Sequence, residues 1–306
     1  METNKVNPMT CDTETGICEI PLVENKIEST DISAIAGKIR LLYFTDPICS
    51  SCWGIEPQLR KLKLEYGEYF NLEYRMGGLL KSWDSYGGSD VGNPKDVAIH
   101  WEEASDYYQM PIDGDVWLED PLDSSYPPSI AFKAAQMQGE DKADLFLRKI
   151  KEMVFLEKKN ISKWEHLEEA AIASGLDAVK FKADYEGAAN IAFEDDLALA
   201  RQLGVRGFPT IFFTDKDDNR FKVYGSKPYE VYEQALLKLY PDAVKKNTDT
   251  SLLSLFEHYP TLTTKEVAVL LSQTFGETEA SLELLNANHA ITRHESKKGT
   301  LWSKKK

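Results

Sequence analysis

The chain has few cysteines and no long hydrophobic run. Only four of its 306 residues are cysteine, and no apolar segment approaches the roughly 18 residues that a membrane-spanning helix needs. The amino-terminal stretch METNKVNPMTCDTETG lacks the apolar core of a secretory signal. We therefore expect a cytoplasmic protein that does not associate with membranes.

Positive charge is also scarce. The formal net charge of −14 argues against broad attraction to nucleic acid or to an anionic membrane. Hydrophobic residues make up 42% of the chain and aromatic residues 11%, which excludes disorder over most of its length. A length of 306 residues is long for one ordinary domain and predicts two or three units.

Hydrophobic patterning divides the chain into three parts. Residues 1–30 are polar, and we expect a flexible extension there. Residues 31–240 combine predicted strands with a mainly helical stretch over about 80–200. Residues 249–306 follow a proline and have their own helix and strand patterns, which predicts a separate carboxy-terminal domain.

In the second part, a strand–helix–strand order surrounds a pair of cysteines. An apolar run at 38–46 predicts a buried strand, and residues 52–66 place apolar side chains at helical spacing. Pro57 is expected to kink that helix. Alternation over 70–76 predicts a second strand. Later segments predict a β-hairpin followed by an amphipathic helix, at 209–214, 220–224 and 228–239.

The sequence Cys49-Ser-Ser-Cys52 at the first strand-to-helix junction is the strongest chemical signal. A helix amino terminus stabilises a thiolate, and two cysteines at this spacing can close a disulfide. Cys49 would then be the exposed nucleophile and Cys52 the resolving thiol. Two alternatives remain, half of a zinc site, which needs two further ligands, or an incidental pair of buried cysteines.

A second signal is Pro209, at the entrance of an apolar strand and close behind Gly207. A proline in this position is a candidate for a cis peptide bond, and the backbone of Phe208 could then pair with an extended substrate chain beside the dithiol. The alternative is a trans proline that simply starts the strand.

These features together resemble the DsbA-like family of the thioredoxin superfamily over about residues 38–240. The resemblance is carried by Leu41-Leu-Tyr-Phe-Thr-Asp-Pro-Ile-Cys-Ser-Ser-Cys-Trp53, the long helical insertion and Gly204-Val-Arg-Gly-Phe-Pro-Thr-Ile-Phe-Phe213. The sequence around the dithiol most resembles a cytoplasmic branch of predicted disulfide isomerases. It also resembles the SpxH-type adaptors, which present a transcription regulator to the ClpXP protease. The implied fold is an α/β thioredoxin-like fold with a large helical insertion.

The resemblance implies roles for the residues around the dithiol. Cys49 would be the nucleophile, Cys52 the resolving cysteine and Pro209 the cis-proline. Ser50 and Ser51 lie between the cysteines where strongly oxidising relatives have a histidine, which predicts a milder depression of the Cys49 pKa and a more reducing couple. Many relatives place a buried carboxylate where this chain has a tyrosine, so a nearby Asp or Glu could serve instead. Candidate accessory residues are Tyr43, Asp46, Trp53 and Glu56.

The other two cysteines, Cys11 and Cys18, lie in the polar extension. On a flexible tether they could form a second dithiol that exchanges with Cys49, because tethering gives a high effective concentration. They could also be two free exposed thiols, or a transient metal clip.

The carboxy-terminal domain at 249–306 has a helix–helix–helix–hairpin order and resembles a winged helix, an α+β unit. That family often binds DNA, but the expected second helix of its helix-turn-helix motif, near 277–285, carries three glutamates and no Lys or Arg. Phosphate would repel such a helix. A protein-interaction or packing role is therefore favoured over DNA binding.

We therefore expect a thiol–disulfide oxidoreductase or disulfide isomerase, acting through Cys49 and Cys52 on a protein or small-thiol disulfide. The competing hypothesis is a non-catalytic adaptor that binds a regulator and a protease. The five histidines show no metal-ligand spacing, and neither a metal nor a cofactor is expected. The acidic stretch 113–120 does not match a calcium loop and is expected to be a solvated loop at the mouth of the active site.

Overall fold

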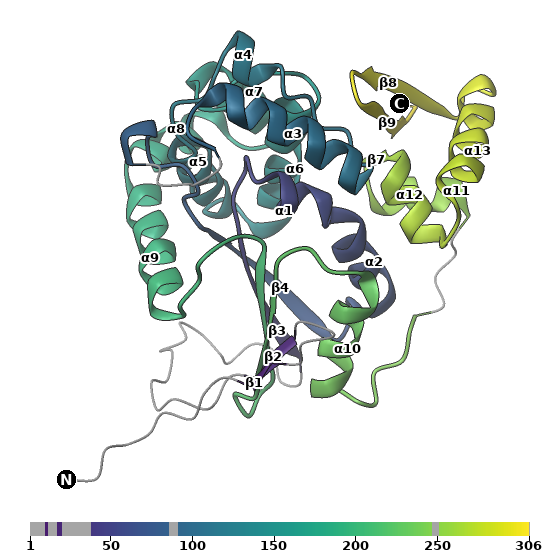
Figure 1. Ribbon diagram of the computed structural model, residues 1–306, viewed down its shortest axis with the longest axis horizontal. Coiled ribbons are helices and arrows are strands. Elements are labelled where there is room, and N and C mark those ends of the chain that lie inside the picture. The colour runs from purple at the N-terminus through teal and green to yellow at the C-terminus, as the bar shows by residue number, and fades with distance from the viewer. Residues whose placement is uncertain (1–9, 12–16, 20–37, 86–90, 247–250, 306) are drawn as a thin grey trace.

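A six-stranded sheet runs through the middle of the molecule in the computed structural model, which describes residues 10–11, 17–19, 38–85, 91–246 and 251–305 (Figure 1). The strand order is β1-β2-β6-β5-β3-β4. Among these described strands β3 and β4 are parallel, and the other neighbouring pairs are antiparallel. The strands are Thr10–Cys11 (β1), Ile17–Glu19 (β2), Ile39–Thr45 (β3), Phe70–Met76 (β4), Thr210–Thr214 (β5) and Arg220–Tyr224 (β6).

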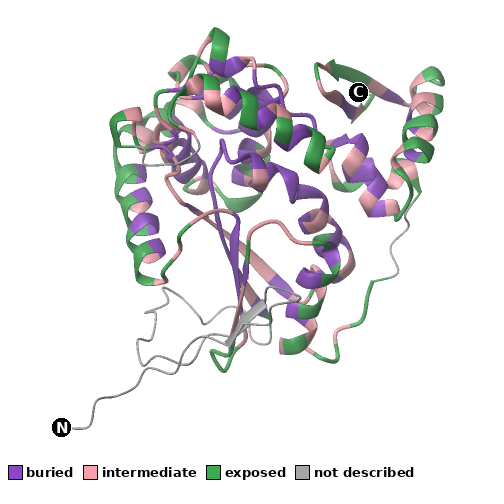
Figure 2. Cartoon of the chain, viewed as in Figure 1, coloured by how far each residue is buried: buried purple, intermediate pink, exposed green. Residues whose placement is uncertain are grey.

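The buried strand predicted at 38–46 is β3, at the centre of this sheet. Its residues are nearly all buried, as Figure 2 shows for the inner strands. A continuous apolar run is typical of a strand covered on both faces. The strand ends at Asp46 and Pro47, where the chain turns into the cysteine pair. The sheet therefore presents Cys49 at its carboxyl edge.

The helix predicted at 52–66 is divided into two. Helix α1 spans Ser50–Gly54 and α2 spans Glu56–Tyr66, with Ile55 between them. Pro57 lies in the first turn of α2, where its missing N–H has no helical partner to lose. The expected kink is thus a break two residues before the proline.

A helical insertion follows β4, as the sequence predicts. Figure 1 shows it packed at one end of the sheet, with α9 returning along one side. Its core is a single apolar cluster that includes Trp101, Phe132 and Phe155. The elements are a 3-10 turn at Trp83–Ser85 and helices at Pro94–Tyr108 (α3), Val116–Glu119 (α4), Tyr126–Gln136 (α5), Glu140–Phe155 (α6), Trp164–Ala173 (α7), Ala178–Glu186 (α8) and Ala188–Gln202 (α9). Helix α10 (Tyr229–Leu239) follows β6 and packs against α2.

The carboxy-terminal unit contains three helices and a three-stranded sheet of order β7-β9-β8. The sequence predicts only the last two strands, because β7 is three residues long and runs directly into α12. Capping boxes at Thr263 and Thr274 begin α12 and α13, and Trp302 is fully buried beneath them. The elements are Leu252–His258 (α11), Thr261–Thr263 (β7), Thr264–Leu271 (α12), Phe275–Ala287 (α13), Ile291–Ser296 (β8) and Gly299–Lys304 (β9).

Helix α12 packs along α2 and joins the carboxy-terminal unit to the sheet-bearing part (Figure 1). Arg148 of α6 makes two bonds to the Glu266 carboxylate, at 2.8 and 3.0 Å, and Arg60 of α2 lies 3.1 Å from the same carboxylate. The Glu266 side chain is fully buried. Burial alone would raise the pKa of Glu266, but Arg148 and Arg60 lower it below its usual value.

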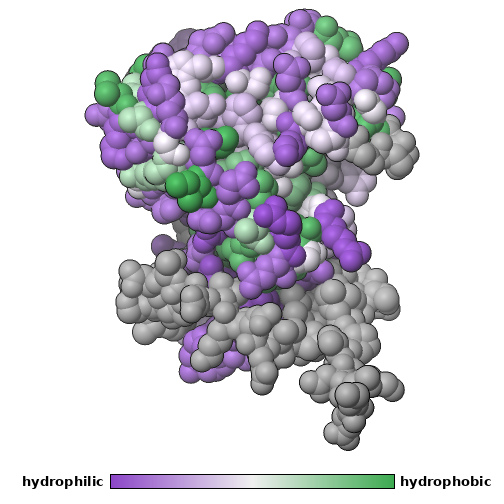
Figure 3. All heavy atoms as spheres, turned by 90° about the vertical axis from the view of Figure 1, so that its left-hand side faces the viewer, coloured by the Kyte–Doolittle hydropathy of each residue, from purple (hydrophilic) through white to green (hydrophobic). Residues whose placement is uncertain are grey.

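On the coloured part of the face in Figure 3, hydrophilic side chains predominate and apolar ones form small spots between them. Exposed apolar residues, such as Val179 of α8 and Ile191 of α9, are scattered along the chain. None of the described helices is both long and apolar enough to cross a membrane.

Candidate functional site

Cys49 and Cys52 form a disulfide at the start of α1, with their Cα atoms 5.1 Å apart. Cys49 is the N-cap residue of α1, and its sulfur accepts a hydrogen bond from the Cys52 amide at 3.1 Å. Cys52 is fully buried and only 5% of Cys49 is exposed. The first cysteine is therefore the only one of this pair that a partner can reach.

The peptide bond between Phe208 and Pro209 is cis and directly precedes β5. Phe208 and Cys49 both line a cavity of about 180 Å³, whose other walls combine aliphatic side chains, two serines, a histidine and three tryptophans. Its tryptophans are Trp83, Trp101 and Trp117. Gly207 lies so close to Tyr224 that an added Cβ would come 2.8 Å from the tyrosine hydroxyl. The structure thus brings together two segments about 160 residues apart in the chain, as expected from the dithiol and the proline motif.

Asp46 is fully buried and ties together three segments around the dithiol. Its carboxylate accepts hydrogen bonds from the amides of Ile48 and Leu79, at 3.1 and 2.7 Å, and from the Ser125 hydroxyl at 2.8 Å. Burial raises the pKa of Asp46 to about 6, although these hydrogen bonds oppose the rise. The geometry is that of a residue that positions loops, because the carboxylate binds the Ile48 amide of its own turn, the Leu79 amide and the Ser125 hydroxyl, which come from three different segments.

The other candidate accessory residues are buried as well. Tyr43 is fully buried and its hydroxyl has no hydrogen-bond partner among the described residues; burial raises its pKa well above the usual value. Glu56 is bound by Lys151 at 2.7 Å. Neither side chain contacts the cysteines through a described hydrogen bond.

Trp53, next to Cys52, connects the dithiol to the helical insertion. Its ring stacks on Phe155 with centroids 5.5 Å apart, and the Arg148 guanidinium lies 4.4 Å from the ring centroid. Its indole N–H donates to the carbonyl of Pro111 at 3.0 Å. Since Arg148 also binds Glu266, Trp53 touches the same residue that holds the carboxy-terminal unit.

Two contacts of the site are not predicted from the sequence. Gly77, which the sequence marks only as the end of a strand, lies against the Phe208 ring so closely that an added Cβ would collide with it. Tyr108 of α3 donates a hydrogen bond to the Ser51 hydroxyl at 3.0 Å and packs against Gly54. Neither contact has a local signal, because each joins segments distant in sequence.

Cys11 and Cys18 are aligned opposite each other in the β1–β2 pair, and β2 pairs with β6 at the edge of the sheet. Their side chains lie outside the described part of the structure, so their roles as a second dithiol, free thiols or a metal clip stay predictions.

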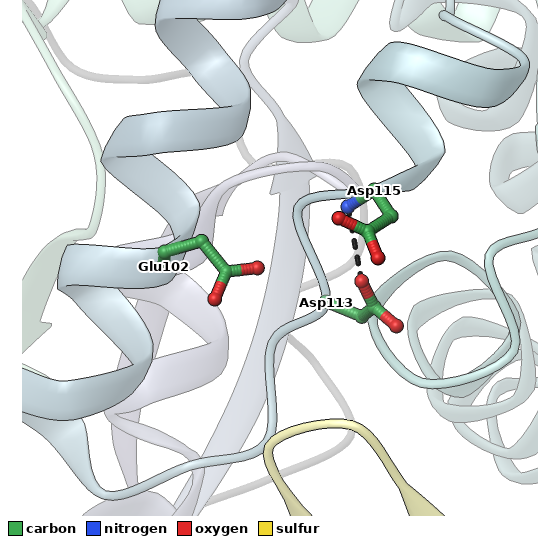
Figure 4. Close-up of side chains that lie close together, drawn as sticks. All are labelled: Glu102, Asp113 and Asp115. Carbon is green, nitrogen blue, oxygen red and sulfur yellow. Dashed lines mark hydrogen bonds between the residues drawn. The ribbon is translucent and has the colours of Figure 1, made fainter.

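The acidic stretch at 113–120 contacts the carboxy-terminal unit. Asp113 and Asp115 face Glu102 of α3, and the three carboxylates lie close enough to hold a metal ion (Figure 4). Lys297, from the β8–β9 turn, binds the cluster instead, at 2.9 Å from Glu102 and 2.7 Å from Asp115. The expectation of a solvated loop at the mouth of the active site is only partly met: Lys297 pairs with Asp115 and Val116–Glu119 form α4, whereas Trp117 of the same stretch lines the cavity beside Cys49.

Comparison with known proteins gives matches over different lengths of the chain. A family model described as thioredoxin matches residues 42–234. The ClpXP adapter protein SpxH of Halalkalibacterium halodurans is 35% identical over 97% of both chains. The protein of the same name from Bacillus subtilis is 32% identical, over 86% of this chain and 88% of its own.

Solved structures share the fold over a shorter length. A putative protein disulfide isomerase from Nitrosomonas europaea has a TM-score of 0.57 at 20% identity and covers 67% of this chain and 98% of its own. The cytosolic disulfide reductase DsbM from Pseudomonas aeruginosa has a TM-score of 0.50 at 25% identity and covers 60% of this chain and 89% of its own.

These matches correct the expected activity. The expectation of a thiol–disulfide oxidoreductase or isomerase is wrong, because the relatives that match almost the whole chain carry the name of an adapter protein. The expected DsbA-like thioredoxin fold is confirmed. The chain therefore belongs to the thioredoxin superfamily and, within it, to the family of the SpxH proteins.

Proposed function

We propose that this protein is a non-catalytic adaptor that presents a transcription regulator, Spx, to the ClpXP protease. One observation carries the proposal: a relative named as a ClpXP adapter matches 97% of this chain and of its own length. That length includes the carboxy-terminal unit, whereas the thioredoxin family model ends at residue 234.

The geometry of the dithiol supports a binding role. Efficient thiol exchange needs an accessible thiolate and a group that can accept its proton. Cys49 is almost fully buried, Asp46 is held by three hydrogen bonds and Glu56 is bound by Lys151. Each nearby carboxylate is thus committed to a structural contact. In this proposal Cys49, Cys52, Gly207, Phe208 and Pro209 form part of a surface for a protein partner.

The carboxy-terminal unit takes a protein-interaction role in the same proposal, with a winged-helix-like arrangement and no DNA partner. Helix α13 exposes glutamates and carries no Lys or Arg, so phosphate would repel it. The proposed units are residues 31–240 and 249–306, preceded by the extension at 1–30, in the cytoplasm.

A degradation assay tests the proposal. Purified ClpXP is incubated with the regulator Spx, with and without the full-length protein, and the loss of Spx is followed over time. We expect the protein to accelerate degradation several-fold without being consumed.

The matched control is the double variant Cys49→Ser, Cys52→Ser. Serine is close to cysteine in size, so this variant removes the thiol chemistry while largely preserving the partner surface. We expect it to keep the stimulation, and we expect neither form to reduce insulin disulfides. Absence of any stimulation by the unaltered protein would overturn the adaptor proposal.

A further inference from the structure

Strand β4 is the last strand of the central sheet. It pairs with β3 along its whole length, and no described strand lies on its other side. Two backbone hydrogen bonds bound the ladder: the Ile39 amide donates to the Tyr69 carbonyl at 2.9 Å, and the Gly77 amide donates to the Thr45 carbonyl at 2.8 Å. An unpaired strand edge is a template for pairing with another extended chain.

The direction of the free backbone groups follows from this ladder. Hydrogen-bonding groups alternate between the two sides of a strand, so if Gly77 faces β3 then Leu72, Tyr74 and Met76 face away from it. The Met76 amide indeed donates away from the sheet, to Asp196 of α9 at 2.9 Å. Among the described residues, the amides of Leu72 and Tyr74 have no comparable partner on the outer side. Two consecutive pairing positions are therefore open.

Leu72 and Tyr74 also line a hollow, which we call the β4 groove. Its volume is about 1000 Å³, and α2 and α6 supply most of its walls. One end is formed by residues 257–261 of the carboxy-terminal unit. The groove therefore depends on a part of the chain that lies beyond the thioredoxin family model, which ends at residue 234.

The chemistry of the β4 groove favours a polypeptide over a small molecule. Small-molecule sites are mostly apolar, with only a few polar groups, whereas charged side chains are spread along these walls. Most of them are paired, as Lys63 is with Asp144 at 3.3 Å. The lining groups without a described ion pair are Glu68, Asp141 and Lys246, all exposed. Two carboxylates against one ammonium leave an acidic rim, on a chain whose net charge is −14.

We propose that the β4 groove is a docking site for an extended segment of the delivered regulator, which adds as a strand to the outer edge of β4 and places a basic residue at Glu68 and Asp141. This inference rests on the proposed adaptor function and names the surface that the regulator occupies. Backbone pairing at Leu72 and Tyr74 supplies affinity, and the acidic rim selects a positively charged segment.

Site-specific photocrosslinking tests the location. The photoreactive amino acid p-benzoylphenylalanine replaces Glu68 or Asp141 in the full-length protein, and replaces Asp217 as the control. Asp217 is equally acidic and exposed but lies in the β5–β6 turn. We expect Spx to be captured from positions 68 and 141 and not from 217, with the crosslinks confined to one segment of Spx. Capture of ClpX, of a second copy or of this chain itself at 68 and 141 would overturn the proposal.

Charge reversal and a proline test the recognition. The double variant Glu68→Lys, Asp141→Lys is expected to bind Spx about tenfold more weakly, while the matched pair Asp217→Lys, Glu230→Lys binds as the unaltered protein does.

Leu72→Pro removes an outward N–H that the ladder does not use, so it is expected to weaken binding more than Leu72→Ala, which removes only side-chain atoms. Unchanged Spx binding and unchanged stimulation of ClpXP by the first double variant would overturn the groove and leave the adaptor function standing. Absence of stimulation by the unaltered protein would instead remove the adaptor function, and the groove proposal with it.

Discussion

The surroundings of Cys49 and the interface between α6, α2 and the carboxy-terminal unit are both buried, but they are built from different kinds of contact. The dithiol is surrounded by backbone hydrogen bonds, small residues and aromatic rings. The interface is held by charges, with Arg148 bound to Glu152 at 2.6 Å and to Glu266 at 2.8 Å. The two kinds of contact predict different sensitivities to mutation. Removing the partner of a buried charge destabilises the folded protein far more than displacing an aromatic ring does.

The interface should be the more sensitive of the two regions, and Arg148→Met tests this most severely. The variant leaves Glu152 and Glu266 buried with fewer partners and removes the guanidinium from the Trp53 ring. We expect the free energy of unfolding to fall by about 3–5 kcal/mol, measured by urea denaturation.

The matched control for that prediction is Lys163→Met, which breaks an exposed ion pair with Asp120 at 2.8 Å. Its expected cost is at most about 1 kcal/mol. Equal losses in the two variants would contradict the view that the buried pair anchors the carboxy-terminal unit.

Asp46 is a buried charged group on the dithiol side of this comparison. Its pKa is raised from 3.8 to about 6. The folded protein therefore holds a proton on Asp46 at pH values where the unfolded chain has lost it. The contribution of Asp46 to stability is greatest below about pH 4 and decreases as the pH rises towards 6.

Urea denaturation of the unaltered protein and of Asp46→Asn, between pH 4 and pH 7, measures this contribution. The stability of the unaltered protein relative to the variant should fall by roughly 3 kcal/mol over that range, on the basis of about 1.4 kcal/mol per pKa unit. The control Asp217→Asn, in an exposed turn, should show no such trend. A constant difference between the unaltered protein and Asp46→Asn would show that the pKa of Asp46 is the same in the folded and unfolded states.

The two regions also differ in how far the sequence reveals them. The dithiol is a local motif, because a buried strand, Cys49 and a helix start occur within fifteen residues and have a recognisable order. The interface is not. Arg148 and Glu266 are 118 residues apart, and each alone reads as an ordinary charged residue on a helix surface. Only the capping box at Thr263 to Glu266 has a sequence signal, and it gives no sign that Glu266 also binds Arg148.

The same distinction explains which elements of the fold the sequence predicts and which it does not. Strands β3 to β6 and most helices follow from apolar periodicity. The short strand β7 has too few residues for a pattern, and the contact of Lys297 with Glu102 depends on packing between distant segments. The expected oxidoreductase activity is wrong for a related reason. A dithiol motif indicates the fold in which it occurs, but the same fold serves different functions.

Gly77 gives the smallest expected effect and the most specific one. Gly77→Ala places a methyl group where the Phe208 ring lies, so the ring or the end of β4 must move. Overpacking of this kind costs about 1–3 kcal/mol, and Phe208 lines the cavity beside Cys49, so partner binding should fall together with stability. Gly276→Ala is the matched control: no atom lies within 4 Å of its added Cβ, and alanine in a helix is more stable than glycine by about 0.5–1 kcal/mol. Denaturation of both variants decides the matter, because a loss of stability at Gly276 as large as that at Gly77 would mean that glycine removal itself, and not the Phe208 ring, is responsible.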